Sequence, residues 1–200
     1  MRKTIVLLFV LLIPFFAFSL EGHLSVNYCP TFSTVNITLE GISGSSTSTL
    51  SAVEITGATY WGHSGIVYKF RFGHITEMNG KKIDNPEYGF NQLLGYSFIT
   101  DISDDWDFVM DIMLLYVQDK ASGYDSSDGY YTVDTYLLEV HGAFQVKYYI
   151  SPVTTLNLGI DIGRPLYCEI EGGGAYAGES YVPTISGVRF APFVGVGVKL

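Results

Sequence analysis

Four histidines, His23, His63, His74 and His141, are the candidates for a general base in this chain. A histidine beside a serine could activate the hydroxyl for attack on an ester. His74 is placed best for this, because it ends an alternating apolar segment that could reach a lipid headgroup. However, no serine stands at a matching spacing. The sequence therefore predicts no catalytic residue and no enzyme activity, and we interpret His141 as a hydrogen-bonded interior residue.

Two further segments have the composition of ligand-binding loops. Asp125-Ser-Ser-Asp128-Gly129 resembles part of a calcium loop but lacks the rest of the ligand pattern. Gly172-Gly-Gly174 is not followed by a helix, so it is not a phosphate-binding loop. We interpret the first as a solvated acidic loop tip and the second as a flexible loop. No metal and no cofactor are predicted.

Cys29 and Cys168 are the two cysteines of the chain. Two cysteines cannot build a disulfide-stapled scaffold, although one bridge between them could form in an oxidising compartment. Two separate buried thiols are the favoured interpretation.

The N-terminal segment has the pattern of a secretory signal. Arg2 and Lys3 are followed by an apolar run from Ile5 to Phe18, which is short for a membrane-spanning helix and contains Pro14. Small residues before position 20 favour cleavage after Ser19. The sequence therefore predicts a signal peptide over 1–19 and one exported domain over 20–200, with an uncleaved anchor as the alternative.

The charge balance excludes some partners. Without Arg2 and Lys3, nine basic residues face 20 acidic ones, so the net charge opposes binding to nucleic acid or to anionic lipid. Only 16% of all residues are charged, which is low for an exported soluble protein. Because no later apolar run reaches 18 residues, the apolar residues must be dispersed by alternation, as in a membrane barrel.

The C-terminal segment shows this alternation most clearly. One face over 187–200 is apolar, and the other holds small, aromatic or charged side chains. The apolar face consists of Val188, Phe190, Pro192, Val194, Val196, Val198 and Leu200. Such a strand suits a wall between lipid and a polar interior. A soluble sandwich strand would share the alternation but direct its charges toward water.

The whole mature chain follows the same design. It has no helical period, and its 22 glycines, 15 tyrosines and 13 phenylalanines are typical of strands and turns. Eight strands are expected near 23–34, 50–60, 64–75, 88–101, 106–118, 135–150, 155–168 and 187–199. Short turns join some of them, whereas 119–133 and 169–186 are expected to be long loops. We predict an all-β fold, a closed eight-stranded antiparallel up-and-down transmembrane β-barrel.

The charged residues of these strands fall on the opposite face from the apolar ones. A lysine or arginine in the middle of the bilayer costs about 2–4 kcal/mol, so these side chains should point inward and pair. The expected ion-pair network of the lumen contains Lys69, Arg71, Asp107, Asp111, Glu139, Lys147, Asp161 and Arg189. Within it, we expect Asp107 and Lys147 to form a pair on neighbouring strands.

Aromatic residues mark the two ends of the apolar band. Trp106 and Tyr116 are ten residues apart on one strand, which corresponds to a height of roughly 25 Å at a tilt near 40°. Together with Tyr136 and Tyr148 they form the predicted aromatic girdle. Tyr124, Tyr130 and Tyr131 could instead join Tyr136 in an adhesive outer surface, but the girdle is favoured.

The signal peptide, the eight alternating strands and the apolar C-terminal strand resemble the small outer-membrane barrels of the OmpA, OmpX and OmpW type. The resemblance implies a location in the cell outer membrane, with membrane lipid and the barrel assembly machinery as partners. In those families the chain typically ends in Phe or Trp, whereas this one ends in Val198-Lys-Leu200.

The resemblance implies an outer-membrane barrel with surface-exposed loops. Its expected role is envelope integrity, interaction with a host or surface ligand through those loops, or passage of small apolar molecules. The alternative is a soluble, secreted or periplasmic carrier similar to a lipocalin, with its apolar faces turned inward around a ligand.

Overall fold

The computed structural model describes residues 21–84, 88–125, 129–174 and 177–200. Its elements are all strands: β1 (Glu21–Tyr28), β2 (Thr31–Leu39), β3 (Ile42–Trp61), β4 (Ser64–Met78), β5 (Lys81–Lys82), β6 (Tyr88–Ser103), β7 (Trp106–Asp125), β8 (Gly129–Ser151), β9 (Thr154–Gly174), β10 (Ser180–Tyr181) and β11 (Thr184–Lys199). Within the described ranges no helix is long and apolar enough to cross a membrane. The predicted signal peptide lies outside the described residues.

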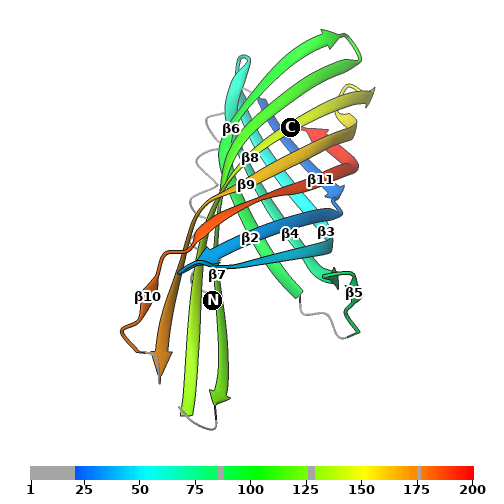
Figure 1. Cartoon of the computed structure of the whole chain (residues 1–200). Coiled ribbons are helices and arrows are strands. Elements are labelled where there is room, and N and C mark those ends of the chain that lie inside the picture. Colours follow the sequence, from blue (N-terminus) through cyan, green and yellow to red (C-terminus); the bar gives the residue numbers. More distant parts are fainter. Residues whose placement is uncertain (1–20, 85–87, 126–128, 175–176) are drawn as a thin grey trace.

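Eight long strands close into a ring, as predicted (Figure 1). β1 and β2 together serve as its first strand, because both pair with β3 on one side and with β11 on the other. The ring continues through antiparallel neighbours in chain order as far as β9 and β11, and it closes where β11 pairs with β1 and β2. Closure leaves no free edge in the wall, which is the condition for a sheet to lie in lipid.

The first strand differs from the predicted 23–34 because it is interrupted at Cys29-Pro30 and continues to Leu39. Proline has no N–H to give to a ladder, so regular pairing breaks there. The chain stays in place because Cys29 N donates to Ala52 O at 2.8 Å. The predicted strand 50–60 is likewise too short, since β3 begins at Ile42. Its first residues are mostly serine and threonine, which lack the apolar alternation that marks a strand in sequence.

The prediction of long loops over 119–133 and 169–186 is wrong. β7 runs on to Asp125 and β8 starts at Gly129, so the two strands form an extended hairpin. The Gly172–Gly174 run predicted as a flexible loop is the end of β9. Glycine and polar residues there are held by pairing with β8, which a sequence pattern does not register.

The two ends of the barrel differ, as Figure 1 shows. At one end, tight turns join β6 to β7 and β8 to β9. At the other end, pairing between β6 and β7 stops at Leu93 and Leu115, and pairing between β9 and β11 stops at Gly163 and Arg189. Beyond these points β7, β8 and β9 continue as a separate sheet. We call this end the hairpin end and the other the turn end.

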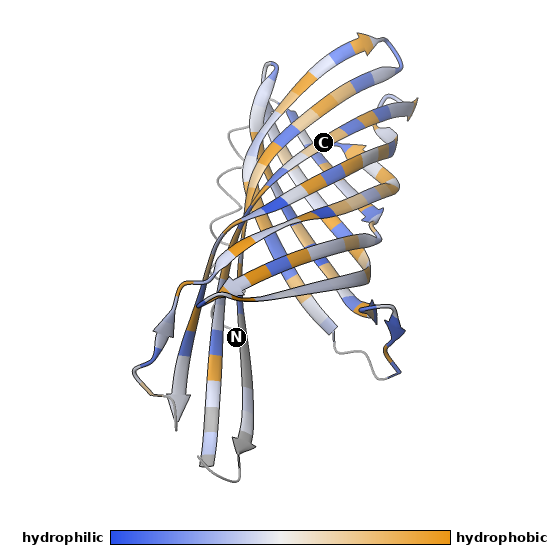
Figure 2. Cartoon of the chain, in the orientation of Figure 1, coloured by the Kyte–Doolittle hydropathy of each residue, from blue (hydrophilic) through white to orange (hydrophobic). Residues whose placement is uncertain are grey.

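Apolar residues point outward and charged residues inward, so hydropathy alternates along each strand (Figure 2). On β9, Leu158 is 67% exposed, whereas Asp161 is 1% exposed. On β11, the apolar face predicted from the sequence is the outer one, and Ala191 and Phe193 of the other face are buried. An apolar surface therefore surrounds the barrel, and the polar side chains are enclosed in its lumen.

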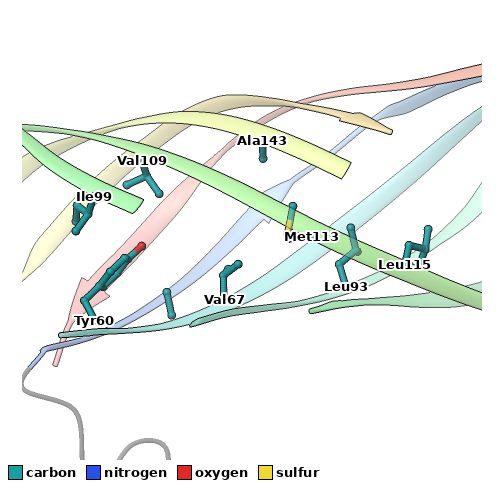
Figure 3. Packing of buried hydrophobic residues seen from close by; sticks show 9 residues of the cluster. Tyr60, Val67, Leu93, Ile99, Val109, Met113, Leu115 and Ala143 are labelled. Carbon is teal, nitrogen blue, oxygen red and sulfur yellow. The ribbon is translucent and has the colours of Figure 1, made fainter. Parts of the chain in front are cut away.

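Part of the interior is apolar as well. A cluster of buried side chains fills one side of the lumen (Figure 3). It contains Ala58, Tyr60, Val67, Leu93, Ile99, Val109, Met113, Leu115 and Ala143. A second, small cluster consists of Cys29, Ala191 and Phe193. The lumen is thus packed with side chains, as expected for a barrel of only eight strands.

Candidate functional site

An arginine at the centre of the lumen joins two strands on opposite parts of the ring. Arg71 of β4 donates to Glu54 of β3, with 2.6 Å from Nη2 and 3.2 Å from Nε to Oε2. The same Nη2 lies 2.9 Å from Asp161 Oδ2 of β9. All three side chains are at most 1% exposed. One buried cation is thus held by two carboxylates, which compensate for its lost hydration.

His141 of β8 extends this network. Its Nδ1 lies 2.7 Å from Asp161 Oδ1, and its Nε2 lies 3.0 Å from Glu139 Oε2. Arg189 of β11, which is half-buried, donates to Glu139 Oε1 at 3.1 Å. Gly163 of β9 makes room for the imidazole, because a Cβ at this position would collide with the ring. β8 and β9 therefore supply the two carboxylates that contact His141, and β9 also supplies the space for its ring.

A second ion pair lies deeper toward the turn end. Lys69 Nζ of β4 is 2.9 Å from Asp111 Oδ2 of β7. Asp111 Oδ1 accepts a hydrogen bond of 2.6 Å from Ser97 Oγ, which lies 2.8 Å from Tyr60 Oη. Lys69 Nζ also lies 5.3 Å from the centre of the Phe193 ring, within range of a cation–π interaction.

The expected Asp107–Lys147 ion pair is not formed. The two residues are cross-strand partners, so the predicted register of β7 and β8 is correct. However, Lys147 Nζ lies 3.0 Å from His23 Nδ1, and Asp107 Oδ2 accepts a hydrogen bond of 2.6 Å from Tyr149 Oη. Lys147 points into the lumen toward β1, which is far away in the sequence. Asp107 instead has its hydrogen-bond partner, Tyr149, at the same end of the barrel.

The eight residues predicted for the lumen network all face the interior, with Arg189 the least buried of them. Three further residues that were not predicted for the lumen are buried in it, namely Glu54, His23 and Asn27. Glu54 had a usable signal, because it stands between Val53 and Ile55, both of which face outward. The rest of its strand lacks a regular alternation of apolar and polar residues, so the sequence did not show which way Glu54 points.

One small cavity lies inside the lumen. The cavity beside His23, Tyr60, Asp111, Gln145 and Lys147 measures about 10 Å³, roughly the space for one water molecule. Gln145 Nε2 is buried without a protein partner there, as is Asn157 Nδ2. The side chains that line this cavity therefore leave room for about one water molecule in this part of the lumen.

The two buried histidines that the structure describes in the lumen contact charged side chains. Among the described residues, His23 and His141 have hydrogen-bonded ring nitrogens. These nitrogens contact carboxylates and Lys147, not a hydroxyl or thiol. His74 is half-buried on the outer face with its ring against Tyr88, at 5.0 Å between centroids. Among the described residues, no group of three His, Cys, Asp or Glu side chains is arranged to hold a metal. Ser126 to Asp128 of the calcium-like segment lie outside them.

Three residues of the predicted girdle are exposed on the outer face, and the fourth is half-buried. Trp106 and Tyr148 are cross-strand partners at the turn end, with ring centroids 4.7 Å apart. Tyr116 lies on the same strand as Trp106 toward the hairpin end. Tyr136 lies beyond it on β8 and donates to Glu171 at 3.2 Å.

The outer faces at the hairpin end carry tyrosines paired with acids. Besides Tyr136, Tyr167 donates to Glu169 at 2.9 Å and Tyr181 donates to Glu179 at 3.0 Å. The hydrogen bond to Glu179 raises the pKa of Tyr181, so its phenol stays protonated at neutral pH. These residues form an aromatic and acidic surface on β8, β9 and the segment around β10. Nothing is described for the side chains of Tyr124 and Tyr131.

Three solved structures share this architecture over most of their length. Neisserial surface protein A is 12% identical, with a TM-score of 0.54 over 88% of this chain and 97% of that one. The outer membrane protease OmpT from Escherichia coli is 10% identical, with a TM-score of 0.52 over 90% and 96%. The outer membrane protein OprG from Pseudomonas aeruginosa is 10% identical, with a TM-score of 0.52 over 90% of this chain and 95% of that one.

These likenesses confirm the fold, that of the small outer-membrane β-barrels which the sequence resembles. No protein-family model matches the sequence, and no curated protein matches it either.

Proposed function

We propose that the chain is an integral protein of the cell outer membrane that interacts with external ligands through its outer hairpins. The observation that carries this proposal is the combination of an apolar outer belt, a lumen filled by an ion network, and hairpins that extend beyond the ring.

The orientation of the side chains separates this proposal from a soluble carrier similar to a lipocalin. Such a carrier needs an apolar cavity for its ligand and a polar exterior. Here Lys69 and Arg71 are buried in the lumen, whereas Leu94, Leu114 and Leu158 are more than half exposed. A barrel with apolar side chains exposed around its whole outer face would aggregate in water, whereas the same side chains pack favourably against lipid acyl chains.

The three expected roles are not supported equally. The small cavity among Tyr60, Asp111 and Lys147, which has room for about one water molecule, argues against free passage of molecules through the barrel. The buried ion network would make the wall rigid, which suits a structural role in the envelope but assigns no partner. The tyrosine and acid pairs on the outer hairpins favour surface interaction, since aromatic side chains with a polar group are enriched at protein interfaces.

Catalysis has little support from the site. One of the similar structures is described as a protease. In this chain His141 is 1% exposed and lies between Asp161 and Glu139, where no substrate can reach it. We therefore infer a non-enzymatic protein.

Membrane insertion and topology can be tested together. The protein should require detergent for extraction and should migrate differently when unheated and when boiled. An epitope tag inserted after Gly41, at the hairpin end, should be labelled on intact cells. A tag after Asp104, at the turn end, should be labelled only after permeabilisation. A protein that remains soluble without detergent, or the reverse labelling, would contradict the proposal.

The roles can then be separated. Liposomes containing the protein should show no solute-dependent swelling, whereas swelling would point to passage. Replacing Glu169, Glu171 and Glu179 by glutamine should leave a folded barrel, because these side chains lie beyond the ring. Cells carrying this variant should adhere less to a surface coated with a cationic peptide. Unchanged adhesion would contradict a role of this acidic surface in interaction.

A further inference from the structure

One row of side chains crosses five strands on the outer face at the hairpin end. Successive cross-strand partners are Phe190 on β11, Phe32 on β2, Thr49 on β3, Glu77 on β4 and Lys82 on β5. Because cross-strand partners point to the same face of a sheet, these side chains form a continuous strip. Four interstrand spacings of about 4.8 Å make the strip about 19 Å long. Its chemistry changes in order from aromatic to hydroxyl to carboxylate to ammonium.

The apolar part of this strip borders a groove. The groove has a volume of about 280 Å³, and the residues that line it include Phe32, Thr34, Thr49, Glu77, Val188 and Phe190. The two phenylalanine rings are 6.5 Å apart, and 47% of Phe32 and 39% of Phe190 are exposed. The groove therefore offers an apolar floor on one side and three threonine hydroxyls, including that of Thr47, on the other.

The ammonium end is held in place by a rigid turn. Asn79 and Gly80 have φ of 51° and 75°, the type I′ geometry that folds β5 back along β4. The Asn79 side chain also accepts a hydrogen bond of 2.8 Å from Thr47 N, which ties the turn to β3. Lys81 and Lys82 are both exposed, and among the described residues no ion pair includes either of them. Lys82, the cross-strand partner of Glu77, therefore offers an ammonium at the end of the strip, whereas Lys81 points to the opposite face.

The strip runs from the apolar belt toward the outside. Barrel strands are tilted by about 40°, so a row perpendicular to them changes height by about 3 Å per strand. Figure 1 shows β5 at the hairpin end of the molecule. An occupant would thus have its apolar part beside Phe190 and Phe32, and its anionic part beside Lys82.

We propose that this strip binds one phosphorylated glycolipid of the outer leaflet, with an acyl chain on Phe32 and Phe190 and a phosphate at Lys82. The threonine hydroxyls and the Glu77 carboxylate hydrogen-bond the sugar hydroxyls between them. The proposal rests on the proposed membrane location. The negative net charge of the chain opposes general attraction to anionic lipids, so binding depends on these local groups and on the sugar.

Native mass spectrometry of the folded protein in non-ionic detergent tests this, with lipid A and phosphatidylglycerol as separate probes. We expect one tightly bound lipid A and at least tenfold weaker binding of phosphatidylglycerol. One surface lysine near an anionic lipid contributes about fivefold in affinity, so Lys82→Gln should weaken lipid A binding about fivefold. Lys82→Arg should retain binding, and Thr49→Val should weaken it several-fold.

Matched controls are Lys199→Gln and Thr100→Val, which alter the same residue types at the turn end. They should leave lipid A binding unchanged. Equal binding of both lipids, a Lys82→Gln variant within twofold of wild type, or equal losses in the controls would each overturn the proposal. Heat-modifiable migration is recorded for every variant. A wild-type barrel that folds in detergent but shows no lipid preference would refute only this site, whereas a chain that stays soluble without detergent would refute the membrane location itself.

Discussion

Arg71 and Asp161 are 90 positions apart in the sequence, yet Arg71 Nη2 and Asp161 Oδ2 are 2.9 Å apart across the lumen. The contact links β4 to β9, which are not neighbours in the ring. It therefore holds two distant parts of the wall together. Glu54 accepts a hydrogen bond from the same guanidinium, so Arg71 connects two buried carboxylates of the lumen.

Replacing Arg71 by methionine should destabilise the barrel strongly. The change leaves Glu54 and Asp161 buried without their cation, and breaking a buried pair in this way costs about 3–5 kcal/mol. Arg71→Lys should also lose stability, because an ammonium cannot reproduce the planar fork. Urea unfolding in lipid vesicles, followed by gel migration, measures the free energy of unfolding.

The matched control for this change is the double variant Arg71→Met with Glu54→Gln, which removes one of the stranded charges. It should be more stable than Arg71→Met alone. A single methionine variant as stable as wild type would show that the network contributes little to stability.

Two glycines on neighbouring strands should respond in opposite ways to alanine. A Cβ on Gly163 would fall on the His141 ring, at 2.7 Å from its Nε2, and displace it from Asp161 and Glu139. Overpacking of this kind costs about 1–3 kcal/mol. Gly142 has no atom within 4 Å of its added Cβ, so Gly142→Ala should be neutral or stabilising by roughly 0.5–1 kcal/mol. Unfolding of both variants in vesicles is compared, and equal effects would contradict the packing described for His141.

An arginine on the outer face should be tolerated only beyond the apolar belt. Phe144 is 43% exposed and lies midway between the aromatic ends, so Phe144→Arg should cost about 2–4 kcal/mol. Thr184 faces outward at the hairpin end, where the same side chain should cost only about 0–1 kcal/mol. The folded fraction after insertion into vesicles distinguishes them. Equal yields would mean that the outer face does not lie in lipid.

Neither cysteine should react in the folded protein. Cys29 and Cys168 are both free and at most 2% exposed, one at the β1–β2 break and the other on β9 beside Leu137. A maleimide reagent should label no thiol in the folded barrel and two after unfolding in detergent. A change of migration on reduction would reveal a disulfide bridge and contradict this arrangement.

Alternation along single strands was sufficient to predict the barrel. The direction of Leu158, Asp161 and Phe144 follows from a period of two combined with the cost of charge in lipid, and both are local properties of the sequence. The same reasoning did not find β3 before position 50 or the ends of β7 and β9. Those segments are stabilised by pairing with neighbours, not by an apolar face, so their own composition looks like that of loops.

The sequence alone thus decided which face of each strand is apolar and that a closed all-β wall was needed to hide the backbone. Only the tertiary structure decided which charges meet inside it. Asp107 and Lys147 are opposite one another, yet Lys147 turns to His23, and Arg71 reaches Asp161. The partner of a lumen side chain depends on strand tilt and on which strands converge across the interior, and these are set by the closure of the whole ring.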